Sequence, residues 1–217
     1  MSLFRIAVPK GRLQEPSLTL FADAGLPVPS RFDLESRALR FATDGFEWIF
    51  VKDADVPVYV EHGAADAGIA GIDQIEEQRA SVYQPLELPF GKCRLMLIGP
   101  EGSAGPEPAR RTTIATKYPL LARERLGARA ARAEIVTLQG SVELALVLGL
   151  ADYIVDLVET GETIRANRLQ PLEVLQEIAP RLAVNRETFR FKGPAVRALI
   201  ENVSRALDAR KIAEVTR

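Results

Sequence analysis

The chain has 217 residues, of which 47% are apolar and 26% charged, and its formal net charge is −1. This composition is typical of a globular protein with an ample core. It provides no overall basic field that would favour nucleic acid. A single cysteine, Cys93, excludes an internal disulfide and fits a reducing compartment. Residues 1–8 are too short for a signal sequence, and no apolar run approaches the roughly 20 residues of a membrane span. We therefore expect a cytoplasmic protein with no membrane partner.

Short apolar runs alternate with amphipathic stretches along the first half of the chain. We expect strands at 4–8, 67–70, 82–88 and 93–98, and helices at 12–24 and 55–63. Two further strands, 39–43 and 47–51, flank Asp44-Gly45, a dipeptide that predicts a type I′ hairpin. Residues 99–111 are rich in glycine and proline and predict a loop.

The second half repeats this alternation. We expect strands at 112–116, 133–138 and 153–158, an extended segment at 172–178, helices at 119–127, 142–148 and 163–167, and a closing helix at 194–213. Alternating strands and helices predict an α/β fold with mostly parallel sheets. We expect two domains, 1–90 plus 180–217 and 91–179, with a ligand cleft between them.

The most informative segment is 152–169, DYIVDLVETGETIRANRL. Its apolar strand runs into Glu159-Thr160-Gly161-Glu162-Thr163, where a helix begins. First-turn amides can bind a phosphate, Gly161 allows close backbone approach, and both threonines add hydroxyl donors. Glu159 and Glu162 would repel an anion and should point outward. An ordinary strand-turn-helix connection with a threonine cap is the alternative interpretation.

Two acids accompany this turn. Asp156 lies inside the apolar strand, where a carboxylate is costly to bury without a partner, and a ribose diol would be a suitable partner. Asp152 lies at the strand start and is expected to be solvated. Glu143 follows Gly140-Ser141 in a helical first turn, with Ser141 as a candidate N-cap. Glu143 is either an acid that faces the same site or a residue that favours the helix dipole.

Two more strand ends carry candidate ligand groups. Lys10 and Arg12 flank Gly11 where the first strand ends, and together they predict an anion clamp. Gly71 and Asp73 follow the strand at 67–70, a weaker signal.

Several motifs are absent. The sequence has no Walker loop and no GxGxxG after a strand. Its one histidine, His62, ends an expected helix and excludes a histidine-rich metal site. Any metal should be a hard cation such as Mg²⁺, held mainly by substrate phosphates.

Six segments, in order, resemble the short form of ATP phosphoribosyltransferase over essentially the whole chain. They are IAVPKGRL, AGIAGID, LPFGKCRL, IATKYP, GSVELA and ADYIVDLVETGETIRANRL. The resemblance implies a two-domain fold like that of periplasmic binding proteins (type II), with the active site in the interdomain cleft. It also implies transfer of the phosphoribosyl group of PRPP to N1 of ATP, with release of pyrophosphate, as the first step of histidine biosynthesis.

The resemblance also implies roles for the candidate residues. The PRPP site would contain Glu143, Asp156, Val158, Glu159, Thr160, Gly161, Glu162 and Thr163. The ATP side would contain Lys10, Gly11, Arg12, Lys52, Gly71, Asp73 and Thr116. Lys10, Arg12, Glu143 and Asp156 would act in catalysis, and Mg²⁺ would be carried by PRPP or pyrophosphate.

The expected partners are a regulatory subunit related to histidyl-tRNA synthetase, in a hetero-oligomer, and a second copy of this chain in a homodimer. Two other functions remain open from the sequence: a cytosolic small-ligand-binding protein of the same fold, and a nucleobase-salvage phosphoribosyltransferase.

Overall fold

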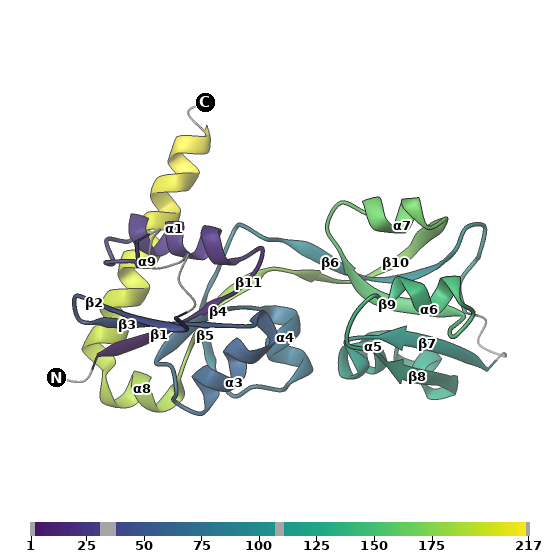
Figure 1. Cartoon of the computed structure of the whole chain (residues 1–217), viewed down its shortest axis with the longest axis horizontal. Coiled ribbons are helices and arrows are strands. Elements are labelled where there is room, and N and C mark those ends of the chain that lie inside the picture. Colours follow the sequence, from purple (N-terminus) through teal and green to yellow (C-terminus); the bar gives the residue numbers. More distant parts are fainter. Residues whose placement is uncertain (1–2, 31–37, 107–110, 216–217) are drawn as a thin grey trace. The chain divides into compact units, whose positions relative to one another are not determined.

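The computed structural model describes residues 3–30, 38–106 and 111–215. The chain divides into two compact units: unit 1 comprises residues 1–91 and 179–217, and unit 2 comprises residues 92–178. Each unit is built around one mixed β-sheet with helices packed on it (Figure 1). Within the described ranges, no helix is long and apolar enough to cross a membrane.

Unit 1 contains a six-stranded sheet in the order β2-β3-β1-β4-β11-β5. The strands are β1 (Phe4–Pro9), β2 (Arg40–Thr43), β3 (Phe46–Val51), β4 (Ala67–Gly71), β5 (Tyr83–Glu87) and β11 (Pro180–Val184). β1 is parallel to β3 and β4, whereas β2 and β11 run antiparallel to their neighbours. Three adjacent parallel strands therefore end at one edge of this sheet.

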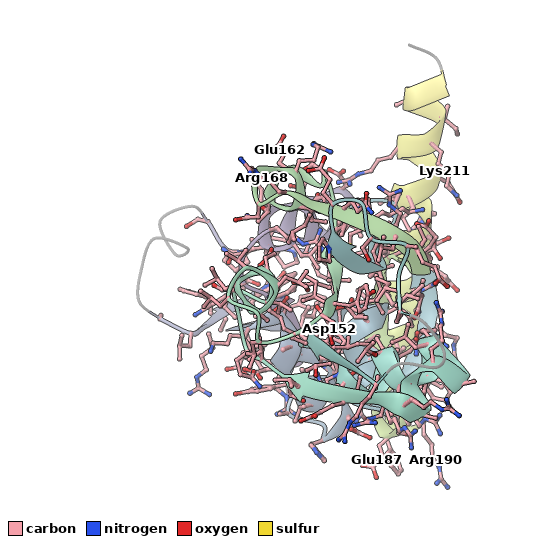
Figure 2. The ribbon with its side chains drawn as sticks, turned by 90° about the vertical axis from the view of Figure 1, so that its right-hand side faces the viewer. Asp152, Glu162, Arg168, Glu187, Arg190 and Lys211 are labelled. Atoms are coloured by element: carbon pink, nitrogen blue, oxygen red, sulfur yellow. The ribbon has the colours of Figure 1, made fainter. Side chains whose placement is uncertain are left out.

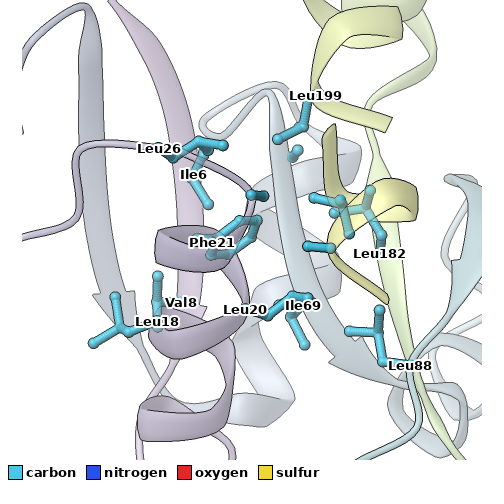
Figure 3. Close-up of a cluster of buried hydrophobic side chains, with 14 of the residues drawn as sticks. Ile6, Val8, Leu18, Leu20, Phe21, Leu26, Ile69, Leu88, Leu182 and Leu199 are labelled. Carbon is cyan, nitrogen blue, oxygen red and sulfur yellow. The ribbon is translucent and has the colours of Figure 1, made fainter. Parts of the chain in front are cut away.

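Helices cover both faces of the unit 1 sheet because alternate residues of β1 point to opposite sides. Ile6 and Val8 pack with Phe21 of α1 (Gln14–Asp23) and Leu199 of α9 (Gly193–Val215), as Figure 3 shows. Ala7 packs on the other side with α3 (Val56–Glu61) and α4 (Ile72–Glu77). The remaining helical segments of unit 1 are η1 (Asp53–Asp55) and α8 (Arg186–Phe191).

A buried polar network joins distant segments of unit 1 around Asp66, whose side chain is 3% exposed. Its carboxylate accepts hydrogen bonds from the Arg5 amide at 2.8 Å and the Thr188 hydroxyl at 2.9 Å. Lys192 donates to both carboxylate oxygens, at 2.9 and 3.0 Å. The C-terminal segment is thus attached to the first strand by a paired charge.

Unit 2 contains a five-stranded sheet in the order β10-β6-β9-β7-β8. The strands are β6 (Cys93–Pro100), β7 (Thr112–Thr116), β8 (Ala133–Thr137), β9 (Tyr153–Val158) and β10 (Leu169–Ile178). The helical segments are α5 (Pro119–Leu126), η2 (Gly127–Arg132), α6 (Glu143–Val147) and α7 (Glu162–Ala166). β7 is parallel to β8 and β9, whereas β6 is antiparallel to β9 and β10.

Two expectations from the sequence were wrong. The sheets are mixed and not mostly parallel, because β2 and β11 run antiparallel to their neighbours in unit 1, and β6 and β10 form antiparallel pairs in unit 2. The hairpin at Asp44-Gly45 is present, but φ is positive only at Gly45 and not at Asp44. A type I′ turn requires positive φ at both residues. The predicted loop at 99–111 lies partly outside the described residues, and Gly99 and Pro100 belong to β6.

Candidate active site

In unit 1, three parallel strands bring the predicted ATP-side residues to one edge of the sheet. Pro9 pairs with Val51, so Lys10 and Lys52 follow neighbouring strand ends. On the other side of β1, Ala7 pairs with Gly68, which places Gly71 near the level of Lys10. Ligands of α/β sheets bind at the carboxyl ends of such strands.

The turn after β1 is held by both local and long-range contacts. The Lys10 amide donates to the Val51 carbonyl at 2.7 Å, and Gly11 has a φ of 90°, which favours glycine. The Arg12 guanidinium donates to the Gly91 carbonyl at 3.1 Å. Gly91 has a φ of 61°, which favours glycine, and a Cβ there would press against the Leu13 side chain. The side chains of Lys10 and Arg12 are exposed at the sheet edge.

Asp73 lies in the first turn of α4 and is 4% exposed. Its Oδ2 accepts a hydrogen bond from Gln74 Nε2 at 2.9 Å, and a Cβ on Gly71 would collide with its Oδ1. Gly71, and not Asp73, is the N-cap of α4, and no side chain caps that helix. His62, at the C-cap of α3, is exposed, as expected for a surface residue.

In unit 2, Asp156 lies on the face of the sheet that α6 and α7 cover. Ile154 and Val158, its neighbours at i±2, pack there with Val142 before α6 and Ile164 of α7. Asp156 is 9% exposed, and its Oδ1 accepts a hydrogen bond from the Leu157 amide at 2.8 Å. An acid therefore sits within an apolar face close to the carboxyl end of β9.

Burial raises the pKa of the Asp156 carboxyl, and this desolvation is the largest effect. The Leu157 amide and the positive charge of Lys117 lower that pKa, while the negative charge of Glu143 raises it. Glu143, in the first turn of α6, is close enough to Asp156 for their charges to interact. That these two acids face the same site stays a prediction, which their electrostatic interaction supports.

Ser141 is not the N-cap of α6, contrary to the prediction. The N-cap is Val142, no side chain caps the helix, and Ser141 has a φ of 46°. Its carbonyl instead accepts from the Leu144 amide at 3.1 Å. By contrast, Asp152 is exposed as expected, and its Oδ2 accepts from the Thr113 amide at 2.8 Å.

The turn after β9 has the predicted geometry for backbone approach. Gly161 is in the left-handed region, with a φ of 75°, and is the N-cap of α7. Glu159 and Glu162 are both exposed, and Figure 2 places Glu162 at the surface. The Thr160 hydroxyl accepts from the Glu162 amide at 3.4 Å, so the threonine that contacts the helix start is Thr160 and not Thr163.

α7 has five residues, so its dipole contributes less positive charge than a long helix would. Thr160 and Thr163 are exposed, and Gly161 is half-buried. First-turn amides have no acceptor within a helix. The turn therefore offers backbone and hydroxyl donors, but the short helix adds little positive electrostatic potential.

Thr116 occupies a different environment from the one predicted. It is fully buried in unit 2, donates its hydroxyl to the Val155 carbonyl at 2.6 Å and accepts from the Tyr118 amide at 2.9 Å. The donated and the accepted hydrogen bond of this hydroxyl are both made within unit 2, so we do not retain Thr116 as an ATP contact. The next residue, Lys117, is exposed and interacts with Asp156. Sequence reasoning missed Lys117, although it follows a strand parallel to β9.

The described residues contain no metal cluster, and the apolar cavity of unit 1 lies apart from the predicted site residues. Within the described ranges, no group of three or more His, Cys, Asp or Glu could hold a metal ion. An apolar cavity of about 610 Å³ lies in unit 1 between β1 and α9, and its lining includes Phe4, Phe46 and Leu199. None of the predicted site residues lines this cavity, so the chemistry of the strand ends is a better guide than cavity size.

The model of the HisG family, ATP phosphoribosyltransferase, matches residues 52–209. The chain belongs to this family. An ATP phosphoribosyltransferase from Sorangium cellulosum is 42% identical over 202 residues, covering 93% of this chain and 94% of the relative. This HisG family member is therefore an ATP phosphoribosyltransferase, the enzyme of the first step of histidine biosynthesis.

Solved structures agree with the fold described above. The ATP phosphoribosyl transferase (HisG:HisZ) complex from Thermotoga maritima matches with a TM-score of 0.84 and 32% identity, over 95% of this chain and 98% of that chain. The periplasmic aliphatic sulphonate binding protein SsuA from Escherichia coli matches with a TM-score of 0.62 and 16% identity, over 100% of this chain and 76% of that chain. The predicted two-domain fold like that of periplasmic binding proteins is confirmed.

Proposed function

We propose that this HisG family member transfers the 5-phosphoribosyl group of PRPP to N1 of ATP. The N1 lone pair forms a bond to C1 of the ribose, the bond from C1 to pyrophosphate breaks, and pyrophosphate leaves with the electron pair. Positive charge develops on the ribose ring and negative charge on the leaving group. Such a reaction depends more on orientation and electrostatics than on a strong base.

The observation that carries the proposal is the arrangement at the carboxyl end of β9. Asp156 and Glu143 interact on one face of the sheet. The turn with Thr160, Gly161 and Thr163 begins directly after Val158, the last residue of β9. Two carboxylates suit the ribose hydroxyls, and the turn suits the 5-phosphate. In this proposal the carboxylates orient the ribose and favour its positive transition state.

The exposed strand ends of unit 1 suit the ATP and pyrophosphate end of the reaction. Lys10, Arg12 and Lys52 are cations at the ends of neighbouring parallel strands, next to the glycines Gly11 and Gly71. In the proposal, Lys10 and Arg12 stabilise the charge that accumulates on pyrophosphate. Asp73 is proposed to shape the turn after β4, since its carboxylate already packs against Gly71.

The donor set of unit 2 fits Mg²⁺ only as an ion carried by the substrate. Asp156 and Glu143 form a pair, and in the described part of the chain no third acid, cysteine or histidine completes a cluster. Mg²⁺ keeps several waters and binds through one or two carboxylates and phosphates. When bound with PRPP, it would neutralise part of the pyrophosphate charge.

We also propose two protein partners. The similar Thermotoga maritima structure is a HisG:HisZ complex, which supports a separate regulatory subunit for this chain, related to histidyl-tRNA synthetase. The second proposed partner is another copy of this chain, which would form a homodimer within the hetero-oligomer. Size measurements on the chain alone and with the partner test both assemblies.

The decisive experiment incubates the chain with ATP and PRPP, with and without the regulatory subunit, and follows phosphoribosyl-ATP by absorbance. We expect product from ATP and none from free adenine. Product from free adenine and not ATP would favour a salvage enzyme. Binding without turnover, even with the partner present, would favour a ligand-binding protein.

A further inference from the structure

We propose that Arg94 and Arg165 provide the positive charge that holds the 5-phosphate of PRPP beside the turn at 159–163. This inference rests on the proposed function and adds two residues to the donor site. Arg94 belongs to β6 and Arg165 to α7, so the two cations come from different elements of unit 2.

The turn itself needs added positive charge. A phosphate monoester carries close to two negative charges at neutral pH. The turn contributes two more acids, Glu159 and Glu162, and the buried Asp156 lies three residues before it. Because α7 has five residues, its dipole cannot offset these charges. Cationic side chains near the turn are the remaining source of attraction.

Strand register places Arg94 at this site. In the antiparallel pair of β6 and β9, Met96 lies opposite Asp156 and Arg94 lies opposite Val158. Directly opposed residues point to the same face of a sheet. Met96 and Val158 pack in the same apolar cluster under α6 and α7, which identifies that face. Arg94 is therefore on the Asp156 face, at the last residue pair before the turn.

The contacts of Gly161 place Arg165 at the same turn. Arg165 is the fourth residue of α7, and its amide donates to the Gly161 carbonyl at 3.1 Å. A Cβ on Gly161 would lie 3.2 Å from Arg165 Nη1 and 4.0 Å from its Cζ. The guanidinium thus folds back over the glycine whose backbone is proposed to approach the phosphate.

Both guanidinium groups are available to an anion. Arg94 and Arg165 are exposed, and among the described residues neither side chain makes a hydrogen bond or ion pair. Arg129 of the same unit, by contrast, donates to Glu173 through two nitrogens. A guanidinium binds phosphate oxygens in a bidentate manner, so two of them can match a terminal phosphate.

The experiment measures steady-state kinetics of the complex with the regulatory subunit, and binding of ribose 5-phosphate, which has the 5-phosphate but no pyrophosphate. We expect Arg94→Gln and Arg165→Gln each to raise the KM for PRPP and the Kd for ribose 5-phosphate about tenfold. The KM for ATP and the thermal unfolding temperature should stay unchanged. Arg94→Lys and Arg165→Lys keep the charge but lose the bidentate geometry, so they should recover part of the loss.

Arg123→Gln is the matched control, because Arg123 is an exposed arginine of the same unit on α5, at a hollow lined by the starts of β7 and β8. Arg123→Gln should leave the KM values for PRPP and ATP and the Kd for ribose 5-phosphate unchanged. A double variant, Arg94→Gln with Arg165→Gln, completes the set. If it kept the wild-type KM for PRPP and Kd for ribose 5-phosphate while the wild type makes product, this inference alone would be overturned. An equal loss in Arg123→Gln would reduce it to a general charge effect and also overturn it. A wild type that makes no product from ATP and PRPP would instead refute the proposed function.

Discussion

The Thr116 hydroxyl donates to the Val155 carbonyl at 2.6 Å, which joins β7 to β9 one residue before Lys117 on one strand and Asp156 on the other. The same oxygen accepts from the Tyr118 amide at 2.9 Å. This buried bond fixes the register of two parallel strands at the carboxyl ends where the proposed donor site begins. Its loss should therefore affect both stability and the alignment of the site.

Thr116→Val should destabilise the protein by about 1–3 kcal/mol, because it leaves a buried carbonyl and a buried amide without partners. Chemical denaturation measures this change. The KM for ATP should remain near the wild-type value, since the hydroxyl is already used within the sheet. A variant of wild-type stability with a raised KM for ATP would contradict this assignment and restore Thr116 as an ATP contact. Thr113→Val, on the same strand but half-buried, is the control.

Asp156→Asn should stabilise the unliganded enzyme at neutral pH and weaken PRPP binding. Burial raises the pKa of this carboxyl in the folded chain, so the folded state favours the protonated form. That preference supports folding at low pH and is lost as the pH rises through the raised pKa. Asparagine removes the buried charge, so we expect its unfolding temperature to be higher at pH 7 by on the order of a few degrees.

The stability difference at Asp156 should shrink as the pH falls towards the unfolded aspartate pKa of about 3.9. In the same variant, the KM for PRPP should rise about tenfold or more, because a neutral amide accepts ribose hydroxyls less well. Asp152→Asn is the control: that side chain is exposed and accepts from the Thr113 amide. If Asp156→Asn lowered the unfolding temperature at pH 7, or kept the wild-type KM for PRPP, the proposed role would be wrong.

Arg12→Ala should lower turnover roughly a hundredfold without unfolding the protein. An electrostatic donor of this kind is commonly worth about 3 kcal/mol in the barrier, and the Arg12 side chain is exposed at the end of β1. Turnover is measured with the regulatory partner present, and folding by thermal unfolding. Arg40→Ala, another exposed arginine of unit 1, should keep full turnover. Near-wild-type turnover in Arg12→Ala would remove this residue from the site.

The sequence was most informative where apolar periodicity and turn chemistry agreed. The strand at 153–158 was predicted with its observed bounds, and the turn after it was predicted as the start of a helix, where the structure has Gly161 as the N-cap. The helix predicted at 55–63 shows the limit of periodicity: Val56 and Val60 are fully buried, but Tyr59, whose spacing would place it on their face, is 38% exposed. Which face of a short helix is buried depends on the elements that pack against it, and the sequence of the helix alone does not contain that information.

Among the described elements, α4, β11, α8 and the two 3-10 segments, η1 and η2, were not predicted. α4 follows β4 without an intervening loop, so no turn residue signals its start. β11 begins at Pro180, and proline is depleted in strands except at a first residue or edge. For the candidate site, the sequence indicated individual polar residues that follow strands, but not which of them lie next to one another. The order of strands in the sheet decides that, and it places Lys117 and Arg94 beside β9.

Asp66→Ala should destabilise unit 1 by about 3 kcal/mol or more, because removing one partner leaves the other polar groups of a buried network unpaired. The Asp66 carboxylate accepts from the amide of Arg5 in β1 and from the hydroxyl of Thr188 in α8. It also accepts from Lys192, which lies between α8 and α9. Chemical denaturation followed by the fluorescence of Trp48, the one tryptophan, which is fully buried in unit 1, measures the loss. Lys211→Ala, at an exposed pair with Asp208, should change the free energy of unfolding by less than about 0.5 kcal/mol. Equal free energies of unfolding for the two variants would show that the Asp66 network does not hold the C-terminal segment on the first strand.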